Sequence, residues 1–159
     1  MDDDKTLEKA TSLALRYLSF RARSEAEMKA YLRRQHPGPV VEAVTLRLKE
    51  QGLVDDAAFA HAWSQSRVSF RPRSASLIRR ELRAKGVDRD TAQAAVEALD
   101  DDEIAYAAGL RAAASLADAD YGTFRRQLWG FLQRRGFGLA LTRKTVHRLW
   151  EEGRSGTGD

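Results

Sequence analysis

The chain has 159 residues, 43% of them hydrophobic and 31% charged, with a formal net charge of +4, which is typical of one folded domain or a few small modules. It has no cysteine, which excludes disulfides, thiolate metal sites and cysteine nucleophiles together. No apolar run approaches the roughly 20 residues that a membrane span needs, and the acidic N-terminus lacks a signal region, so we expect a cytoplasmic protein without membrane contact.

Only 18 residues are Val, Ile or Thr, whereas Ala, Leu, Arg and Glu, which propagate helices well, dominate the chain. We therefore expect an all-α fold. In chain order, residues 1–54 predict three helices. The first ends at Phe20, the second opens with a capping box of Ser24 and Glu27, and the third ends at Gly52.

Residues 55–99 predict the same succession. Asp55 caps a first helix, Ser74 caps a second helix that Gly86 ends, and Asp88 starts a third.

Residues 100–152 form the last predicted group, which opens in the acidic run 100–103. Residues 153–159 have no apolar anchor, and we expect a disordered tail there. Across the chain, five aromatic side chains at helical spacing are predicted to lie in the core: Phe59, Trp63, Phe124, Phe131 and Trp150.

A repeat with a period near 50 residues underlies these groups. Residues 19–24 (Ser-Phe-Arg-Ala-Arg-Ser) and 69–74 (Ser-Phe-Arg-Pro-Arg-Ser) agree at five of six positions. The leucines at the ends of the three second helices keep the same spacing: Leu32, Leu82 and Leu132. The pattern predicts three tandem three-helix repeats in an elongated, curved helical array.

Two phenylalanines, Phe20 and Phe70, occupy this repeated turn beside Arg21 and Arg71. The favoured interpretation is that both rings pack between adjacent modules, because the two turns must close in a similar way. The alternative is that the rings stack on nucleic-acid bases.

Positive charge is concentrated in three stretches, with net charges of +4 in 16–34, +6 in 67–85 and +7 in 123–148. Acidic residues gather at helix starts, where they complement the helix dipole. Helix stability does not require the same basic surface three times. We therefore expect a positive face that binds either phosphates or an acidic groove of another protein. The alternative interpretation is that arginine is simply the preferred solubilising residue.

No pattern in the sequence indicates catalysis. His36, His61 and His147 lie in different modules without a metal-ligand spacing, and the acidic run 100–103 is typical of a helix start rather than a Mg²⁺ loop. A phosphate-cradling glycine loop is absent as well. We expect no catalytic residues, no metal and no cofactor.

These features together resemble the RecX family, the regulators of the bacterial recombinase RecA. Residues 52–60 (Gly-Leu-Val-Asp-Asp-Ala-Ala-Phe-Ala), followed by Trp63 and Arg67, are similar to the family's central helix. Residues 77–87 (Leu-Ile-Arg-Arg-Glu-Leu-Arg-Ala-Lys-Gly-Val) are similar to its next helix and glycine stop. Further upstream, the positions similar to the family's first repeat are Ala14, Tyr17, Leu18, Ser19, Arg21, Arg23, Ser24, Glu27 and Leu32. The resemblance covers about residues 10–150.

The resemblance implies an all-helical protein that binds the helical groove of the RecA–DNA filament. Members restrain filament growth, ATP turnover, strand exchange and SOS repressor cleavage, and some also bind DNA. The candidate contact residues here are the basic side chains on each repeated turn and second helix: Arg21, Arg23, Arg67, Arg71, Arg73, Arg79, Arg80, Arg83, Lys85, Arg125, Arg126, Arg134 and Arg135. Arg79, Arg80 and Arg83 are expected to form one exposed face beside a buried stripe.

Two other function classes stay open. The basic faces alone would suit a generic DNA-binding helical protein that binds single- or double-stranded DNA without recombinase specificity, and a helical array alone would suit a structural adaptor. A monomer is the natural expectation for a repeat array with capped ends.

Overall fold

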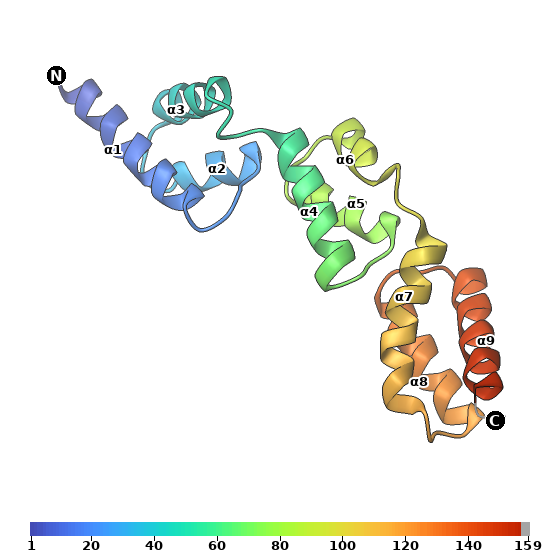
Figure 1. The fold of residues 1–159 in the computed structure, drawn as a ribbon. Helices are drawn as coiled ribbons and strands as arrows, with labels where there is room; N and C mark the ends of the chain where they lie inside the picture. Colours follow the sequence, from blue (N-terminus) through green and yellow to red (C-terminus); the bar gives the residue numbers. More distant parts are fainter. Residues whose placement is uncertain (157–159) are drawn as a thin grey trace. The chain divides into compact units, whose positions relative to one another are not determined.

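The computed structural model describes residues 1–156, and within them every regular element is helical (Figure 1), which confirms the all-α prediction. The helices are, in order, α1 (Asp2–Leu18), α2 (Glu25–Leu32), α3 (Gly38–Glu50), α4 (Asp56–Phe70), α5 (Ala75–Ala84), α6 (Arg89–Val96), α7 (Asp101–Ala113), the 3-10 turn η1 (Ala114–Leu116), α8 (Tyr121–Arg134) and α9 (Leu139–Ser155). None of these helices is long and apolar enough to cross a membrane. The repeat count and the elongated, curved form stay predictions.

The helix starts follow the predicted capping residues. Ser24 accepts a hydrogen bond from the Glu27 backbone N–H at 3.1 Å, and the Glu27 carboxylate accepts from the Ser24 N–H at 3.2 Å, so the predicted capping box is confirmed. Ser74 caps α5 in the same way, by accepting from the Leu77 N–H at 3.1 Å. The aspartate caps of α4, α6 and α7 are also confirmed: Asp55, Asp88 and Asp100.

The helix ends depend on three glycines. Gly52, Gly86 and Gly136 have φ angles of +73°, +81° and +89°, in the left-handed region where a side chain is unfavourable. Gly52 and Gly86 stand where the sequence predicts helix ends. At the far end of the chain, α9 continues to Ser155, so residues 153–155 form its last turn rather than a disordered tail. Residues 157–159 lie outside the described part.

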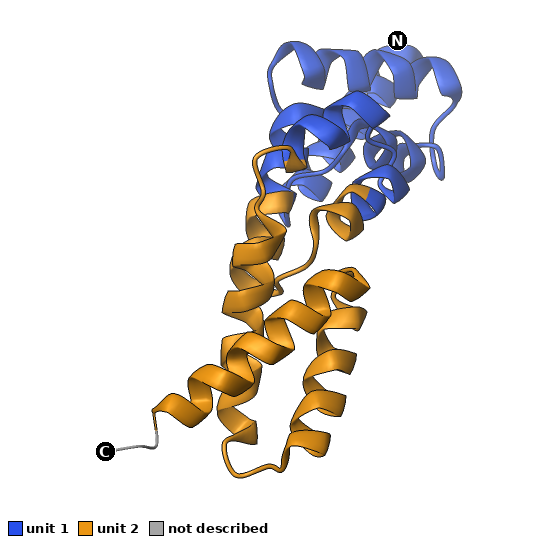
Figure 2. Cartoon of the chain, turned by 90° about the vertical axis from the view of Figure 1, so that its right-hand side faces the viewer, with its two compact units in different colours: residues 1–63, 80–95 blue, residues 64–79, 96–159 orange. Residues whose placement is uncertain are grey.

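The chain divides into two compact units, and the boundary passes through α4 and α5 (Figure 2). Unit 1 comprises residues 1–63 and 80–95, and unit 2 comprises residues 64–79 and those from 96 onward. In unit 1, α1, α2 and α3 enclose the side chains of Ala10, Ala14, Met28, Leu32, Val41, Val44, Leu48 and Val54. In unit 2, α7, α8 and α9 enclose Ile104, Ala105, Phe124, Leu128, Leu132, Phe137, Val146 and Leu149.

The predicted aromatic core is partly confirmed. Phe59 and Phe124 are buried, with 4% and 5% of their surface exposed. Trp63 is only half-buried, and its indole N–H donates to Glu81 Oε2 at 3.1 Å. Phe131 and Trp150 are likewise half-buried and pack against the core of unit 2.

Candidate functional site

The repeated turn of residues 19–24 closes against the end of α5 in unit 1. The Ser24 hydroxyl donates to the Lys85 carbonyl at 2.6 Å, and the Glu25 N–H donates to Asp56 Oδ1 at 2.8 Å. A Cβ on Gly86 would overlap the Cβ of Ala26, so only glycine allows this approach. We call these contacts the Ser24 joint.

The second copy of the turn, residues 69–74, closes in the same manner in unit 2. The Ser74 N–H donates to the Arg135 carbonyl at 2.9 Å, and the Ala75 N–H donates to Asp101 Oδ1 at 2.9 Å. A Cβ on Gly136 would lie 2.6 Å from Ser74 Oγ. These contacts form the Ser74 joint, which brings the basic turn 69–74 beside the end of α8.

The predicted basic residues at the Ser24 joint are engaged within the fold. Arg21 forms an ion pair with Glu27 at 2.6 Å, and Lys85 lies 3.8 Å from the same carboxylate. The Arg23 guanidinium lies 3.8 Å from the centroid of the Tyr17 ring and its Nε donates to the Tyr17 carbonyl. These side chains hold the first turn in place, and the negative charge of Glu27 lies beside the positive charges of Arg21 and Lys85.

Glu27 is the acidic centre of this arrangement. Burial acts to raise the pKa of Glu27, but hydrogen bonds from Arg21 and the Ser24 N–H, together with the charges of Arg21 and Lys85, outweigh burial and lower that pKa. The ionised carboxylate is therefore the form that fits the Ser24 joint.

At the Ser74 joint several arginines gather around Arg135. Burial lowers the pKa of Arg135, and the positive charges of Arg73, Arg71 and Arg134 lower it further. The charges of Arg71, Arg73 and Arg134 thus act on Arg135, and we call these four side chains the arginine cluster. An anion placed among them would relieve that repulsion, and the planar guanidinium fork suits both phosphate and carboxylate.

The remaining predicted contact residues lie outside this cluster. On α5, Arg79, Arg80 and Arg83 are exposed beside buried Ile78 and Leu82, as the spacing predicts. The Arg83 guanidinium also donates to the Val87 carbonyl at 3.0 Å. On α8, Arg125 and Arg126 are exposed, and Arg125 lies over the Trp129 ring at 4.7 Å. Arg67 on α4 is half-buried.

Two exposed rings were misassigned from the sequence. Phe20 and Phe70 are 75% and 82% exposed, so the interpretation that they pack between modules is wrong. Both joints instead close through hydrogen bonds of serine, aspartate and backbone groups. The sequence does indicate that the two residues share a role, because the same ring occupies the same position of both repeated turns.

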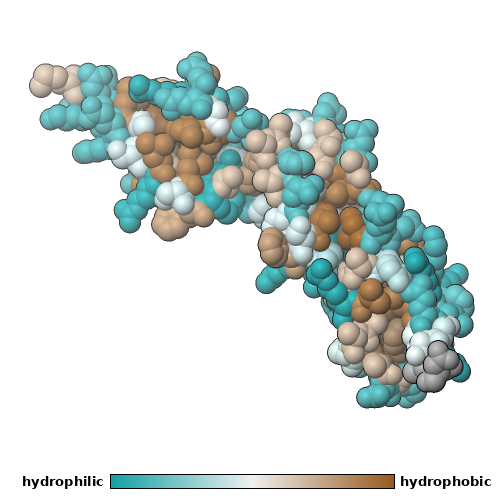
Figure 3. All heavy atoms as spheres, viewed as in Figure 1, coloured by the Kyte–Doolittle hydropathy of each residue, from teal (hydrophilic) through white to brown (hydrophobic). Residues whose placement is uncertain are grey.

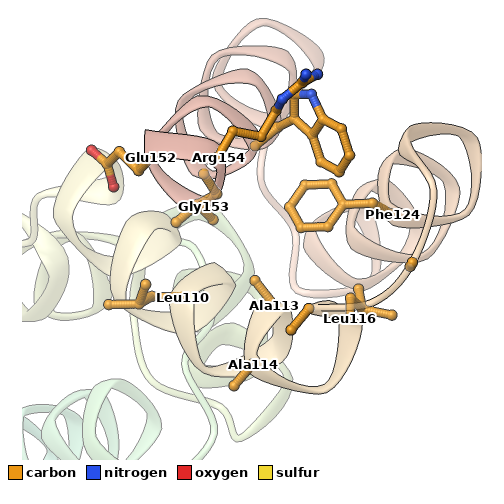
Figure 4. Close-up of a pocket in the computed structure, with 12 residues that line it drawn as sticks. Leu110, Ala113, Ala114, Leu116, Phe124, Glu152, Gly153 and Arg154 are labelled. Atoms are coloured by element: carbon orange, nitrogen blue, oxygen red, sulfur yellow. The ribbon is translucent and has the colours of Figure 1, made fainter. Parts of the chain in front are cut away.

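Unit 2 also has an apolar pocket that the sequence did not indicate. It has a volume of about 590 Å³ and lies between α7, η1, the start of α8 and the end of α9. In Figure 4 the Phe124 ring points into this pocket, whereas the Glu152 carboxylate points away from it. Apolar side chains also reach the surface elsewhere, between hydrophilic ones (Figure 3), so an apolar hollow alone does not distinguish a site.

Comparison with known proteins identifies the family. The model of the first three-helix domain of RecX matches residues 10–56, and the model of the second matches residues 55–96. Regulatory protein RecX from Thermobifida fusca is 39% identical over 147 residues, which are 90% of this chain and 80% of the relative. Regulatory protein RecX from Chlorobium limicola is 33% identical over 151 residues, which are 94% of this chain and 95% of the relative.

A solved structure shares the fold. The crystal structure of RecX from Lactobacillus salivarius superposes with a TM-score of 0.77 at 20% sequence identity, covering 92% of this chain and 97% of that one.

Proposed function

The chain belongs to the RecX family of regulatory proteins, and on that premise we propose that it regulates the bacterial recombinase RecA. It binds the RecA–DNA filament in its helical groove and restrains filament growth, ATP turnover, strand exchange and SOS induction. The observation that carries this proposal is the match to RecX regulatory proteins over nine-tenths of the chain. The protein acts in the cytoplasm by binding, without a catalytic step.

The arginine cluster is the proposed centre of the contact. The positive charges of Arg71 and Arg134 act unfavourably on Arg135, and an anionic partner beside these side chains would offset that effect. The exposed arginines of α5 extend the basic surface. By contrast, Arg21, Arg23 and Lys85, although predicted as contacts, are held by partners within unit 1 and contribute to stability.

The test is the DNA-dependent ATPase of the recombinase with this protein titrated in. We expect wild type to inhibit, and the double variant Arg71→Glu, Arg134→Glu to need at least tenfold more protein, about 1.4 kcal/mol of lost binding free energy. Reversal at Arg83 is less informative, because that side chain also supports the turn at Val87.

The matched control is Arg143→Glu. Arg143 is exposed near the start of α9, where a negative charge is not unfavourable, and it lies outside the predicted contact set. An ATPase that is unchanged by a large excess of wild type would refute the regulator proposal.

A second candidate function is DNA binding without recombinase specificity, which the arginine cluster favours by itself. Equal, strongly salt-dependent binding to bare and to recombinase-coated DNA would select it. A strong preference for the coated filament would select the regulator, and binding to neither would select an adaptor.

A further inference from the structure

We propose that two adjoining hollows of unit 2 form a docking site for an acidic segment of a partner protein. An apolar side chain of that segment, a phenylalanine or a leucine, enters the pocket beside Phe124. Its neighbouring carboxylates bind Arg126 and Arg134, which line the second hollow. Every residue of the site belongs to unit 2. The inference goes beyond the regulator proposal, because it depends on the chemistry of the two hollows and requires neither recombinase nor DNA.

The first hollow is the apolar pocket of about 590 Å³ between α7, η1, the start of α8 and the end of α9. Its larger apolar lining residues are Leu110, Leu116, Phe124, Leu149 and Trp150. The ring centroids of Tyr121 and Phe124 lie 5.1 and 5.2 Å from that of Trp150, so packed rings support one wall. The Phe124 ring points into the space (Figure 4), which has room for a large apolar side chain together with its backbone.

The pocket is open, and this chain does not supply a suitable side chain to fill it. Leu110, which lines the pocket, is 51% exposed. The residues that follow the described part, 157–159, are Thr-Gly-Asp and have no apolar side chain. A second copy would bring its most exposed rings, Phe20 or Phe70, each of which precedes an arginine. That arginine would meet the positive charges of the second hollow, which favours a different protein as the partner.

The charge that the pocket itself offers is positive. Two charged residues, Glu152 and Arg154, belong to its lining. The Glu152 carboxylate points away from the pocket (Figure 4), where it accepts hydrogen bonds from the Tyr106 hydroxyl and, at 2.9 Å, from Arg148 Nε. The Arg154 guanidinium lies 5.5 Å from the centroid of the Trp150 ring, which is part of the pocket wall. A negatively charged segment is therefore favoured at the pocket entrance.

The second hollow adjoins the first at Leu116, which lines both. It has a volume of about 470 Å³, and the charged residues of its lining are both positive, Arg126 and Arg134. Asp120 is the nearby acid, but its pKa is lowered chiefly by its hydrogen bonds with Thr123 and only in part by the charge of Arg126. That carboxylate caps α8 by accepting from the Thr123 N–H at 2.8 Å. The neutral lining residues are Ala112, Ser115, Leu116, Gln127, Leu128 and Phe131.

A glycine inside α8 determines where one of these cations lies. A Cβ on Gly130 would lie 3.0 Å from Arg134 Nη1 and 3.9 Å from its Cζ, so the guanidinium extends back along α8 over Gly130. Gly130 is one helical turn after Arg126, and both cations thus line the same stretch of the helix. Glycine is unfavourable within a helix, and Gly130 has neither a positive φ nor a place at the helix end. The missing side chain therefore makes room for a guanidinium.

An acidic segment with an apolar anchor fits both hollows at once. A large apolar side chain buried in a preformed pocket is the typical energetic centre of a protein interface. Carboxylates on either side of it match the planar guanidinium groups of Arg126 and Arg134. A nucleic-acid strand would offer phosphates to the same arginines, but the polar edges of a base would lose their hydrogen bonds in the apolar pocket. A protein segment is therefore the better match.

The test measures binding of the full chain to fluorescent decapeptides by anisotropy. The first peptide consists of glutamates with one phenylalanine, the second has alanine in place of the phenylalanine, and the third has lysines in place of the glutamates. We expect the first to bind at least tenfold more tightly than the second, and the third not to bind. Arg126→Gln with Arg134→Gln should weaken binding of the first two peptides and lower its dependence on salt.

Two variants close the apolar pocket. Ala117→Trp adds a ring at an exposed position of its lining, and Leu110→Glu adds a negative charge at its exposed rim. Both should weaken binding of the phenylalanine peptide about tenfold and change binding of the alanine peptide less than twofold. The matched control is Ala107→Trp, because Ala107 is exposed on α7 and lines neither hollow. It should bind all three peptides as wild type does.

The proposal is overturned if the phenylalanine peptide does not bind, or if the alanine or lysine peptide binds equally well. It is also overturned if Ala117→Trp and Leu110→Glu, folded as judged by circular dichroism, bind the phenylalanine peptide as wild type does. An equal loss in Ala107→Trp would overturn it too. The assay contains no recombinase, so failure of the regulator proposal is recognised separately, from an unchanged ATPase.

Discussion

The two members of each aspartate pair, Asp55–Asp56 and Asp100–Asp101, make different hydrogen bonds. The first member of each pair caps its own helix, α4 or α7. The second member accepts the N–H of Glu25 or Ala75, a residue at the start of a helix in the preceding group. The same dipeptide thus caps one helix and fixes a long-range contact. The charge pattern alone explains these aspartates only by their favourable interaction with the helix dipole.

At the residue scale, the glycines give a sharp prediction. Gly52 and Gly86 both have a left-handed backbone, but a Cβ on Gly52 meets nothing within 4 Å, whereas one on Gly86 overlaps Ala26. We expect Gly52→Ala to cost about 1–2 kcal/mol of unfolding free energy from backbone strain alone. Gly86→Ala should cost roughly 1–3 kcal/mol more, because the Ser24 joint has to open.

Urea denaturation measures both costs. Gly153→Ala is the control within a helix, where open space and ordinary φ make the change neutral or stabilising by up to about 1 kcal/mol. Equal costs for Gly52→Ala and Gly86→Ala would show that the close approach to Ala26 contributes nothing to stability.

At the scale of elements, the carboxylate of one residue connects α2 with the turn after α1 and with the end of α5. Glu27 on α2 pairs with Arg21 in the turn after α1 and with Lys85 at the end of α5. The ring of Trp63 on α4 lies 5.4 Å from Lys85 Nζ and 6.0 Å from Arg21 Cζ, so the same cations also cover an aromatic face. The Ser24 joint is thus held partly by charge, and its strength depends on pH.

The lowered pKa of Glu27 sets the direction of that dependence. A carboxyl group whose pKa is lower in the folded than in the unfolded state contributes stability above its unfolded pKa, and loses it as the pH falls through the folded pKa. We expect unfolding free energy to decrease from about pH 4.5 downward for wild type. Glu27→Gln, which preserves the shape of the capping box, should be less stable at pH 7 and should lose less on acidification.

The difference between the two proteins isolates this group, because Asp56, whose pKa is raised mainly by burial, is present in both. Thermal melts at several pH values measure it. Parallel curves for wild type and Glu27→Gln would mean that Glu27 titrates alike in the folded and unfolded chain.

Sequence alone predicted the features that depend on neighbours along the chain. The capping residues Ser24, Ser74 and Asp88 and the buried leucines follow from local spacing, which is why these predictions are confirmed. The bond from Ser24 to Lys85 joins residues 61 apart, and no local pattern indicates such a partner. The exposure of Phe70 was missed for the same reason, since it depends on how the joint closes.

At the scale of the whole molecule, the two ends of the chain differ from its middle. The turn after α2 has no left-handed residue where the other groups have a glycine, and it ends at Pro37, the N-cap of α3, with a φ of −70°. The start of α8 is capped by Asp120 in place of the joint serine, with the Thr123 N–H donating to it at 2.8 Å. Neither the turn after α2 nor the start of α8 therefore has the residue that its counterpart uses in the two joints.

We accordingly expect a monomer. Head-to-tail association through a joint would need a left-handed glycine after α2 and a serine before α8, and the described residues have Pro37 and Asp120 at the starts of α3 and α8 instead. Sedimentation velocity over a wide range of concentrations should give a single species of 17.8 kDa. A species whose mass grows with concentration would contradict this expectation.

The joints also make the length of the protein adjustable. Residues 55–99 carry both halves of the contact: Asp56 and Gly86 receive the turn before them, and Ser74 with Ala75 supplies the turn for the next group of helices. A second copy of this segment inserted after Leu99 would find complementary partners on both sides. Duplication of this segment within the gene would thus add a group of helices, and no new interface would have to evolve. Such growth would leave turns at a regular spacing, as the 50-residue spacing of the two turns in this chain illustrates.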